Sequence, residues 1–132
     1  MTLSERDRSI LDINQAMLNC VVQGDWTTYA STCAADLSCF EAETNGVLAE
    51  GLPFHRYYFE LPDDGAESTP SPVNVTMARP HLRWLNDDAV VLSYTRLTQR
   101  MVGGEALTAS CCETRIWQRQ GERWLQVHVH RS

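Results

Sequence analysis

The chain has 132 residues and a formal net charge of -6, with 43% hydrophobic and 21% charged residues. This length and balance are typical of one globular domain, so we expect residues 1–132 to form a single domain. The acidic excess opposes binding to nucleic acid or anionic lipid, and no apolar run approaches the ~20 residues of a membrane span. Neither nucleic acid nor a membrane is therefore expected as a partner.

Two further features concern the cellular compartment. Residues 1–8 are polar and carry charges of both signs, which does not fit a secretory signal. The five cysteines are an odd number and favour free thiols over a disulfide framework. We therefore predict a cytoplasmic location.

The N-terminal quarter predicts two helices. Ser4 and Asp7 are spaced as in a capping box, and apolar residues then recur at helical spacing until Gly24. Asp25 can cap a short second helix that runs to about Cys33. The two helices are expected to meet at a corner around Gly24.

The middle of the chain predicts a strand, a helix and a loop. Residues 37–40 are apolar and suit a short strand, whereas the residues after Gly51 suit a helix. Residues 61–72 are rich in Pro, Ser, Asp and Gly without periodicity, which indicates an exposed acidic loop. The aromatic residues of the predicted helix are Phe54, Tyr57, Tyr58 and Phe59.

The second half of the chain has a period of two, typical of strands. Turn sequences separate four long segments, which are residues 73–85, 89–101, 105–120 and 123–131. Helices followed by an antiparallel meander indicate an α+β fold, and strands this long must curl. We therefore predict a cone-shaped, curved antiparallel sheet wrapped around the long N-terminal helix.

Strand alternation draws attention to three arginines. Arg96 and Arg131 each end an otherwise apolar face, and Arg115 stands between Glu113 and Trp117. The apolar partners on these faces are Val90, Leu92 and Tyr94 for Arg96, and Leu125, Val127 and Val129 for Arg131. The three guanidinium groups are expected to converge.

A guanidinium in an apolar cleft must be paired, because burying it alone costs several kcal/mol. In one interpretation Glu113, Glu41 or Glu43 supplies the pairing and the arginines are structural. In the other, the arginines outnumber the acids and leave a site for a small carboxylate or phosphate, held by bidentate hydrogen bonds. The sequence leaves both interpretations open.

The histidines near the C-terminus raise the question of a metal. His128 and His130 are two residues apart and would point the same way on a strand, with Trp124 on the same face. Two ligands do not make a site, although His55 or His81 could approach in the fold. We therefore predict no metal and no cofactor, and we interpret this aromatic, histidine-rich face as a contact surface between subunits.

No motif for catalysis stands out. Nucleophile arrangements, glycine-rich phosphate loops and paired catalytic carboxylates all lack the required context. An enzyme in a cone of this shape would use one acid, histidine or tyrosine inside the cavity, and Tyr94 and His55 are the nearest candidates.

Several blocks, in the same order along the chain, closely resemble the association (hub) domain of the type II calcium/calmodulin-dependent protein kinases. The match covers nearly the whole chain. The blocks are Gly24-Asp25-Trp26, Phe40-Glu41, Glu50 to Glu60, Arg79-Pro80-His81, Tyr94 to Gln99, Glu113 to Trp117 and Val127 to Ser132.

The resemblance implies a nuclear transport factor 2-like (cystatin-like) cone whose subunits join as homodimers that stack into rings. It also implies a deep arginine-lined pocket, with His55 near its mouth, that accepts small carboxylate-bearing ligands. The candidate ligand-binding residues are Arg96, Arg115, Arg131, His55, Tyr94 and Glu113.

The chain also departs from the family pattern. It shows no kinase domain or calmodulin-binding segment, so neither phosphorylation nor calmodulin binding is expected. Where the family has two acids before Thr-Arg, this chain has Cys112 and Glu113. The leading hypothesis is a non-catalytic, self-assembling module with an anion pocket. The alternative is a small enzyme of the same superfamily, such as a cyclase, isomerase or dehydratase, that acts on a hydrophobic substrate.

Overall fold

A computed structural model of the chain describes residues 2–41, 44–53, 55–56 and 73–132. Residues 52–53 and 55–56 are helical, as expected for the start of the predicted helix after Gly51. The aromatic side chains Phe54, Tyr57, Tyr58 and Phe59, and the predicted acidic loop, lie outside the described residues.

Both N-terminal helices are present with the predicted caps. α1 spans Glu5–Gln23, and the Ser4 hydroxyl accepts a hydrogen bond from the Asp7 amide (3.2 Å) while the Asp7 carboxylate accepts one from the Ser4 amide (3.0 Å). α1 ends at Gly24, whose φ of 69° lies in the left-handed region that glycine adopts without strain. α2 spans Trp26–Ser31 and ends earlier than predicted, because the chain already enters a strand at residue 33.

The capping box gives a first testable consequence. Replacing Ser4 by alanine removes the acceptor for the Asp7 amide and should lower the free energy of unfolding by about 1 kcal/mol. Chemical denaturation measures this change. Ser9→Ala is the matched control, because Ser9 is exposed within the same helix and alanine is the better helix former there. A Ser4→Ala variant as stable as Ser9→Ala would contradict this role for the cap.

The start of α1 is also fastened to the sheet. The Trp84 indole donates a hydrogen bond to the Asp7 carboxylate at 2.8 Å, and the Arg6 guanidinium lies 4.1 Å from the centre of the Trp84 ring. The hydrogen bond from Trp84 is the largest cause of a lowered Asp7 pKa. The N-terminal turn of α1 is therefore fixed by a cap and by an aromatic anchor.

The sheet has six strands in the order β2-β1-β6-β5-β4-β3. The predicted meander is confirmed, since the last four strands pair antiparallel in sequence order. β1 is longer than predicted and pairs parallel with β6, an arrangement that the sequence pattern did not reveal. The strands are β1 Cys33–Phe40, β2 Ala49–Glu50, β3 Val73–Asn86, β4 Ala89–Val102, β5 Glu105–Gln120 and β6 Arg123–Arg131.

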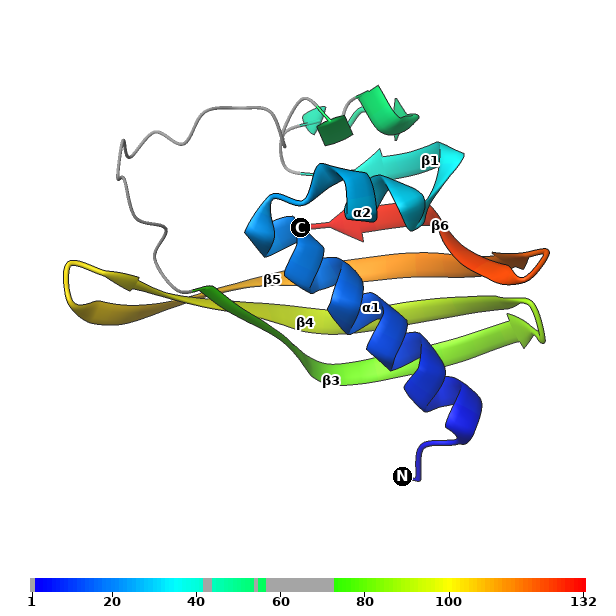
Figure 1. Ribbon diagram of the computed structural model, residues 1–132, viewed down its shortest axis with the longest axis horizontal. Helices are drawn as coiled ribbons and strands as arrows, with labels where there is room; N and C mark the ends of the chain where they lie inside the picture. The colour runs from blue at the N-terminus through cyan, green and yellow to red at the C-terminus, as the bar shows by residue number, and fades with distance from the viewer. Residues whose placement is uncertain (1, 42–43, 54, 57–72) are drawn as a thin grey trace.

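α1 crosses one face of the curved sheet (Figure 1), and we call this the inner face and the opposite one the outer face. The Trp117 indole on the inner face donates to the Asn14 amide oxygen at 3.0 Å, and both side chains are fully buried. Gln15 donates to the Val75 carbonyl at 2.8 Å. The predicted α+β cone is therefore confirmed, with its core between α1 and the inner face.

A bulge in β6 changes which of its residues face inward. Ile116 pairs with His128 but Trp117 pairs with Gln126, so the bulge falls at Val127. Gln126 is turned to the inner face and fully buried. The prediction that Leu125 and Val127 share a face with Arg131 is therefore wrong, as is the placement of Trp124 beside the histidines. Trp124 packs edge-on against the Trp84 ring instead.

Among the described residues, neither edge strand of the sheet offers a long uninterrupted ladder for strand addition. β3, at one edge, is interrupted between Ala78 and His81, where Arg79 has a φ of 53° and Pro80 has no amide hydrogen to donate. β2, at the other edge, has two residues. Copies of this chain are therefore expected to meet through faces rather than by extending one sheet.

Candidate functional site

A buried carboxylate organises the inner face. Glu113 on β5 has no exposed side-chain surface, and it accepts hydrogen bonds from the Tyr94 hydroxyl (2.5 Å) and from Nη1 of Arg96 (3.1 Å). Arg115 donates to the same carboxylate through Nη2 (3.1 Å) and Nε (3.2 Å). Two guanidinium groups therefore share one carboxylate.

The register of β4 and β5 explains this cluster. Tyr94 is directly opposite Glu113, and Arg96 is two residues along the same face of β4. Arg115 follows Glu113 on the inner face of β5, on the side away from Arg96. The carboxylate thus lies between the two arginines, and a shift of β5 by one residue would send Glu113 and Arg115 to the outer face.

The charges of the cluster do not balance. Although burial raises the pKa of Glu113, the positive charge of Arg115, the Tyr94 hydrogen bond and Arg96 prevail and lower it to about 2. Burial likewise lowers the pKa of Arg115, but Glu113 and Tyr94 raise it well above its usual value. At neutral pH one negative and two positive charges remain, so the cluster carries one net positive charge.

Gln126 is a further hydrogen-bond partner of Arg115. It was not among the residues predicted from the sequence. Its amide oxygen accepts from Arg115 Nη1 at 2.6 Å, and its amide nitrogen donates to Thr32 Oγ1 at 2.9 Å. The bulge at Val127 brings Gln126 to the inner face, and strict alternation hides this. Arg96 similarly donates to the Thr98 hydroxyl at 3.2 Å through Nε.

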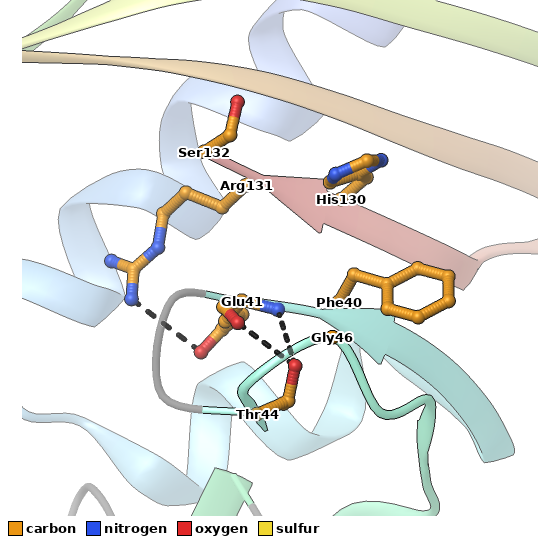
Figure 2. Close-up of a pocket in the computed structure, with 7 residues that line it drawn as sticks. All are labelled: Phe40, Glu41, Thr44, Gly46, His130, Arg131 and Ser132. Atoms are coloured by element: carbon orange, nitrogen blue, oxygen red, sulfur yellow. Dashed lines mark hydrogen bonds and ion pairs between the residues drawn. The ribbon is translucent and has the colours of Figure 1, made fainter.

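Arg131 lies apart from these direct contacts, at the end of β6. Its Nη2 is 3.5 Å from the Glu41 carboxylate, and its side chain is 28% exposed. Figure 2 shows Arg131 and Glu41 at one side of a cavity of about 470 Å³, with His130 and Phe40 at the other. The cavity is lined by Phe40, Glu41, Thr44, Gly46, His130, Arg131 and Ser132.

His55 is buried and linked to α2. Its Nδ1 lies 3.2 Å from the Tyr29 hydroxyl, and the two rings are stacked at 5.8 Å. Burial, followed by the charges of Arg115 and Arg131, lowers the pKa of His55 to about 4. Both arginines therefore act electrostatically on His55, which is neutral at pH 7. Tyr29 was not among the predicted site residues, because its contact with His55 joins two segments that are separate in the sequence.

These contacts pair all three arginines with acids, as one of the two interpretations expected, although the three arginines share two carboxylates. Glu113 forms ion pairs with Arg96 and Arg115, and Glu41 forms an ion pair with Arg131. Glu43 lies outside the described residues. With a pKa of about 2, Glu113 is a poor proton acceptor at neutral pH and does not suit a general base. Tyr94 is likewise a poor proton acceptor at neutral pH, because burial raises its pKa to about 12 and the hydroxyl stays protonated.

The C-terminal histidines point the same way, as their spacing predicted, and lie on the outer face. His128 Nδ1 is 2.7 Å from the Ser38 hydroxyl, and the Phe40 ring centre lies 6.2 Å from the His128 ring and 5.5 Å from the His130 ring. Burial, followed by the charge of His130, lowers the pKa of His128. Among the described residues, no three His, Cys, Asp or Glu side chains are grouped so as to hold a metal ion.

Two findings bear on the expectations about compartment. All five cysteines are free thiols, as the odd number predicted. Within the described part of the chain, no helix has both the length and the apolar character required to cross a membrane.

Comparison with solved structures first defines the fold class. A nuclear transport factor 2-like protein from Cytophaga hutchinsonii covers 98% of this chain and 98% of its own, with a TM-score of 0.71 and 17% identity. At that identity the likeness shows the fold alone, which is the nuclear transport factor 2-like fold. The family model for the calcium/calmodulin dependent protein kinase II association domain matches residues 6–132, and the chain belongs to that family.

Individual relatives agree with this assignment. The CaMKII hub homology domain of Chlamydomonas reinhardtii is 40% identical, with a TM-score of 0.90 and 98% coverage of both chains. The association domain of C. elegans CaMKII is 35% identical, with a TM-score of 0.84, and covers 96% of this chain and 95% of its own. The delta subunit of the rabbit (Oryctolagus cuniculus) type II kinase is 35% identical over 128 residues, which are 96% of this chain and 24% of that protein. This chain therefore corresponds to about a quarter of that relative's length.

Proposed function

We propose that this chain acts by self-assembly, forming homodimers that stack into a ring. Membership of the association-domain family over residues 6–132 carries the proposal. The interruption of β3 and the shortness of β2 leave the faces of the sheet as the surfaces through which copies can meet. Light scattering after size-exclusion chromatography tests this proposal at several micromolar concentrations.

The second part of the proposal is an anion site in the interior of the cone. Its support is electrostatic, since Arg96 and Arg115 share the single carboxylate of Glu113 and leave one net positive charge. Arg131 reaches the cavity of about 470 Å³ from the end of β6, and its charge also acts on His55. A small carboxylate bound at Arg131 would compete with Glu41 for the guanidinium, which is partly exposed.

Butyrate, acetate and inorganic phosphate are suitable probes for this site. At least one of them should raise the melting temperature of the protein saturably, and Arg131→Ala should weaken its binding about tenfold or more, because a charge-assisted hydrogen bond is lost. Arg100→Ala is the matched control, since Arg100 is exposed on the far hairpin. The anion site is disproved if no probe gives a saturable shift, or if Arg131→Ala binds as the control does.

A further inference from the structure

The cavity at the end of β6 is lined by an ion pair rather than by one sign of charge. Among the described residues that line it, Arg131 is the arginine and Glu41 is the acid. The cluster around Glu113 does not line the cavity, so its net positive charge acts there only from a distance. A ligand in the cavity therefore meets one guanidinium and one carboxylate side by side.

Strand register brings these two groups together. β1 and β6 run parallel, Phe40 is the cross-strand partner of His130, and Glu41 and Arg131 each follow by one residue. The Thr44 hydroxyl accepts a hydrogen bond from the Glu41 amide (3.3 Å) and donates one to the Glu41 carbonyl (2.8 Å). The backbone of Glu41 is therefore held at the rim of the cavity, and its carboxylate is placed there by the fold.

The ion pair between Arg131 and Glu41 is loose. Its nitrogen and oxygen are 3.5 Å apart, and the side chains are 28% and 14% exposed. The pair between Arg115 and Glu113 is closer, at 3.1 Å, and its side chains are only 4% and 0% exposed. Charge-assisted hydrogen bonds of this kind are usually about 2.7–2.9 Å long. The pair at the cavity can therefore open to admit a ligand at little cost in direct hydrogen bonding.

The two charges restrict the chemistry of that ligand. A ligand with only a carboxylate would take Arg131 from Glu41, and the largely buried Glu41 carboxylate would lose this counter-charge. A ligand with only an ammonium would do the same to Arg131. A zwitterion avoids both costs, because its carboxylate can accept hydrogen bonds from Arg131 while its ammonium donates to Glu41.

The separation of the two charges narrows the class further. Because the guanidinium nitrogen and the carboxylate oxygen are 3.5 Å apart, the two charged groups of the ligand must also be adjacent. An α-amino acid meets this condition, since its ammonium and carboxylate are attached to one carbon atom. A longer amino acid with charges at opposite ends does not.

The opposite side of the cavity suits an apolar or aromatic side chain. Figure 2 shows Phe40 and His130 across from the ion pair, and their ring centres are 5.5 Å apart. The volume of about 470 Å³ is within the range of small-molecule sites. Aromatic rings bind apolar and aromatic groups through contact area and ring packing.

We propose that this cavity binds a free α-amino acid with an apolar or aromatic side chain, its carboxylate on Arg131 and its ammonium on Glu41. The proposal rests on the proposed binding of carboxylates at Arg131 and names the class of carboxylate. Glu41 acts as the specificity-determining residue, because it rewards a ligand that carries an ammonium beside its carboxylate.

Three matched probes test the class of ligand. L-phenylalanine has both charges, phenylpropionate lacks the ammonium, and phenylethylamine lacks the carboxylate. In NMR titrations of the unmodified chain at pH 7, phenylalanine should bind about tenfold more tightly than either of the others, because each of them forfeits a charge-assisted hydrogen bond. Phenylpropionate that binds as tightly as phenylalanine would overturn the proposal.

Variants of the two charged residues test the contacts. Glu41→Gln should weaken phenylalanine about tenfold without weakening phenylpropionate, whereas Arg131→Gln should weaken both. Glu50→Gln is the matched control, because Glu50 is exposed on β2. Circular dichroism checks that all three variants are folded. Equal affinity of Glu41→Gln and Glu50→Gln for phenylalanine would contradict the role of Glu41.

The outcomes separate this proposal from the one on which it rests. If neither phenylalanine nor any simple carboxylate or phosphate binds, both proposals fail. If phenylpropionate or butyrate binds in a manner that depends on Arg131, and phenylalanine binds no better, the anion site stands and the amino-acid site is rejected.

Discussion

Replacing Glu113 by glutamine should lower the free energy of unfolding by about 3–5 kcal/mol, among the largest effects expected of a single substitution in this chain. The substitution leaves the guanidinium groups of Arg96 and Arg115 buried, with their shared counter-charge gone. Urea denaturation at fixed protein concentration measures the loss. The concentration must be held constant because assembly contributes to the apparent stability.

Two companion variants isolate the cause. Glu122→Gln makes the same chemical change in an exposed turn and should shift the free energy of unfolding by less than about 0.5 kcal/mol. Arg96→Met leaves one guanidinium for one carboxylate and should cost less than Glu113→Gln, since the remaining pair with Arg115 is balanced. A Glu113→Gln variant that loses less than Arg96→Met would refute the shared-carboxylate account.

The second large effect is a loss of stability in acid, in two steps. The pKa of His55 is lowered to about 4 in the folded chain, so the unfolded chain binds a proton that the folded chain does not between about pH 6.5 and pH 4. The pKa of Glu113 is lowered to about 2, which gives the same sign between about pH 4.5 and pH 2. Stability therefore falls with falling pH in both windows, with each group contributing up to about 1.4 kcal/mol per pH unit.

Single variants separate the two steps. Denaturation curves from pH 7 to pH 3 should show a shallower decline above pH 4.5 for His55→Gln than for the unmodified chain. Glu113→Gln should make the decline in the free energy of unfolding shallower only below pH 4.5. His81→Gln serves as the control, because His81 is exposed on the edge strand. Identical pH profiles for His55→Gln and His81→Gln would show that His55 is not held neutral by its surroundings.

Along β4 and β5, the inner face of the sheet carries charged side chains and the outer face carries none. Alternation along β4 and β5 puts Arg96, Glu113 and Arg115 under α1 and puts Val91 and Ile116 on the opposite face. A solvated monomer would gain little from this arrangement, since desolvating the ions is costly. The inner cluster keeps one net positive charge, on which the proposed anion site depends.

Much of this arrangement could be predicted from the sequence, because it depends on local periods and caps. The spacing of Ser4 and Asp7 indicated the start of α1, and the period of two in the second half indicated four strands in meander order. The same alternation placed Arg96 and Arg115 on the inner face beside Glu113. These features involve residues that are close in sequence or directly opposite across a short turn.

The features that were missed depend on non-local geometry. The bulge at Val127 adds one residue to β6 without any local signal and so turns Gln126 inward. The parallel pairing of β1 with β6 joins segments about 90 residues apart, which no local period can report. The bond between Tyr29 and His55 likewise joins two elements through the tertiary fold.

The central claim is that this chain is an association domain that assembles with copies of itself. Native mass spectrometry of the purified chain at micromolar concentration tests this most directly, because the 15.0 kDa subunit mass allows the copies to be counted. The account predicts particles with an even number of subunits, with dimers released first when the particles are activated. A spectrum that contains only the 15.0 kDa monomer at every concentration would contradict it.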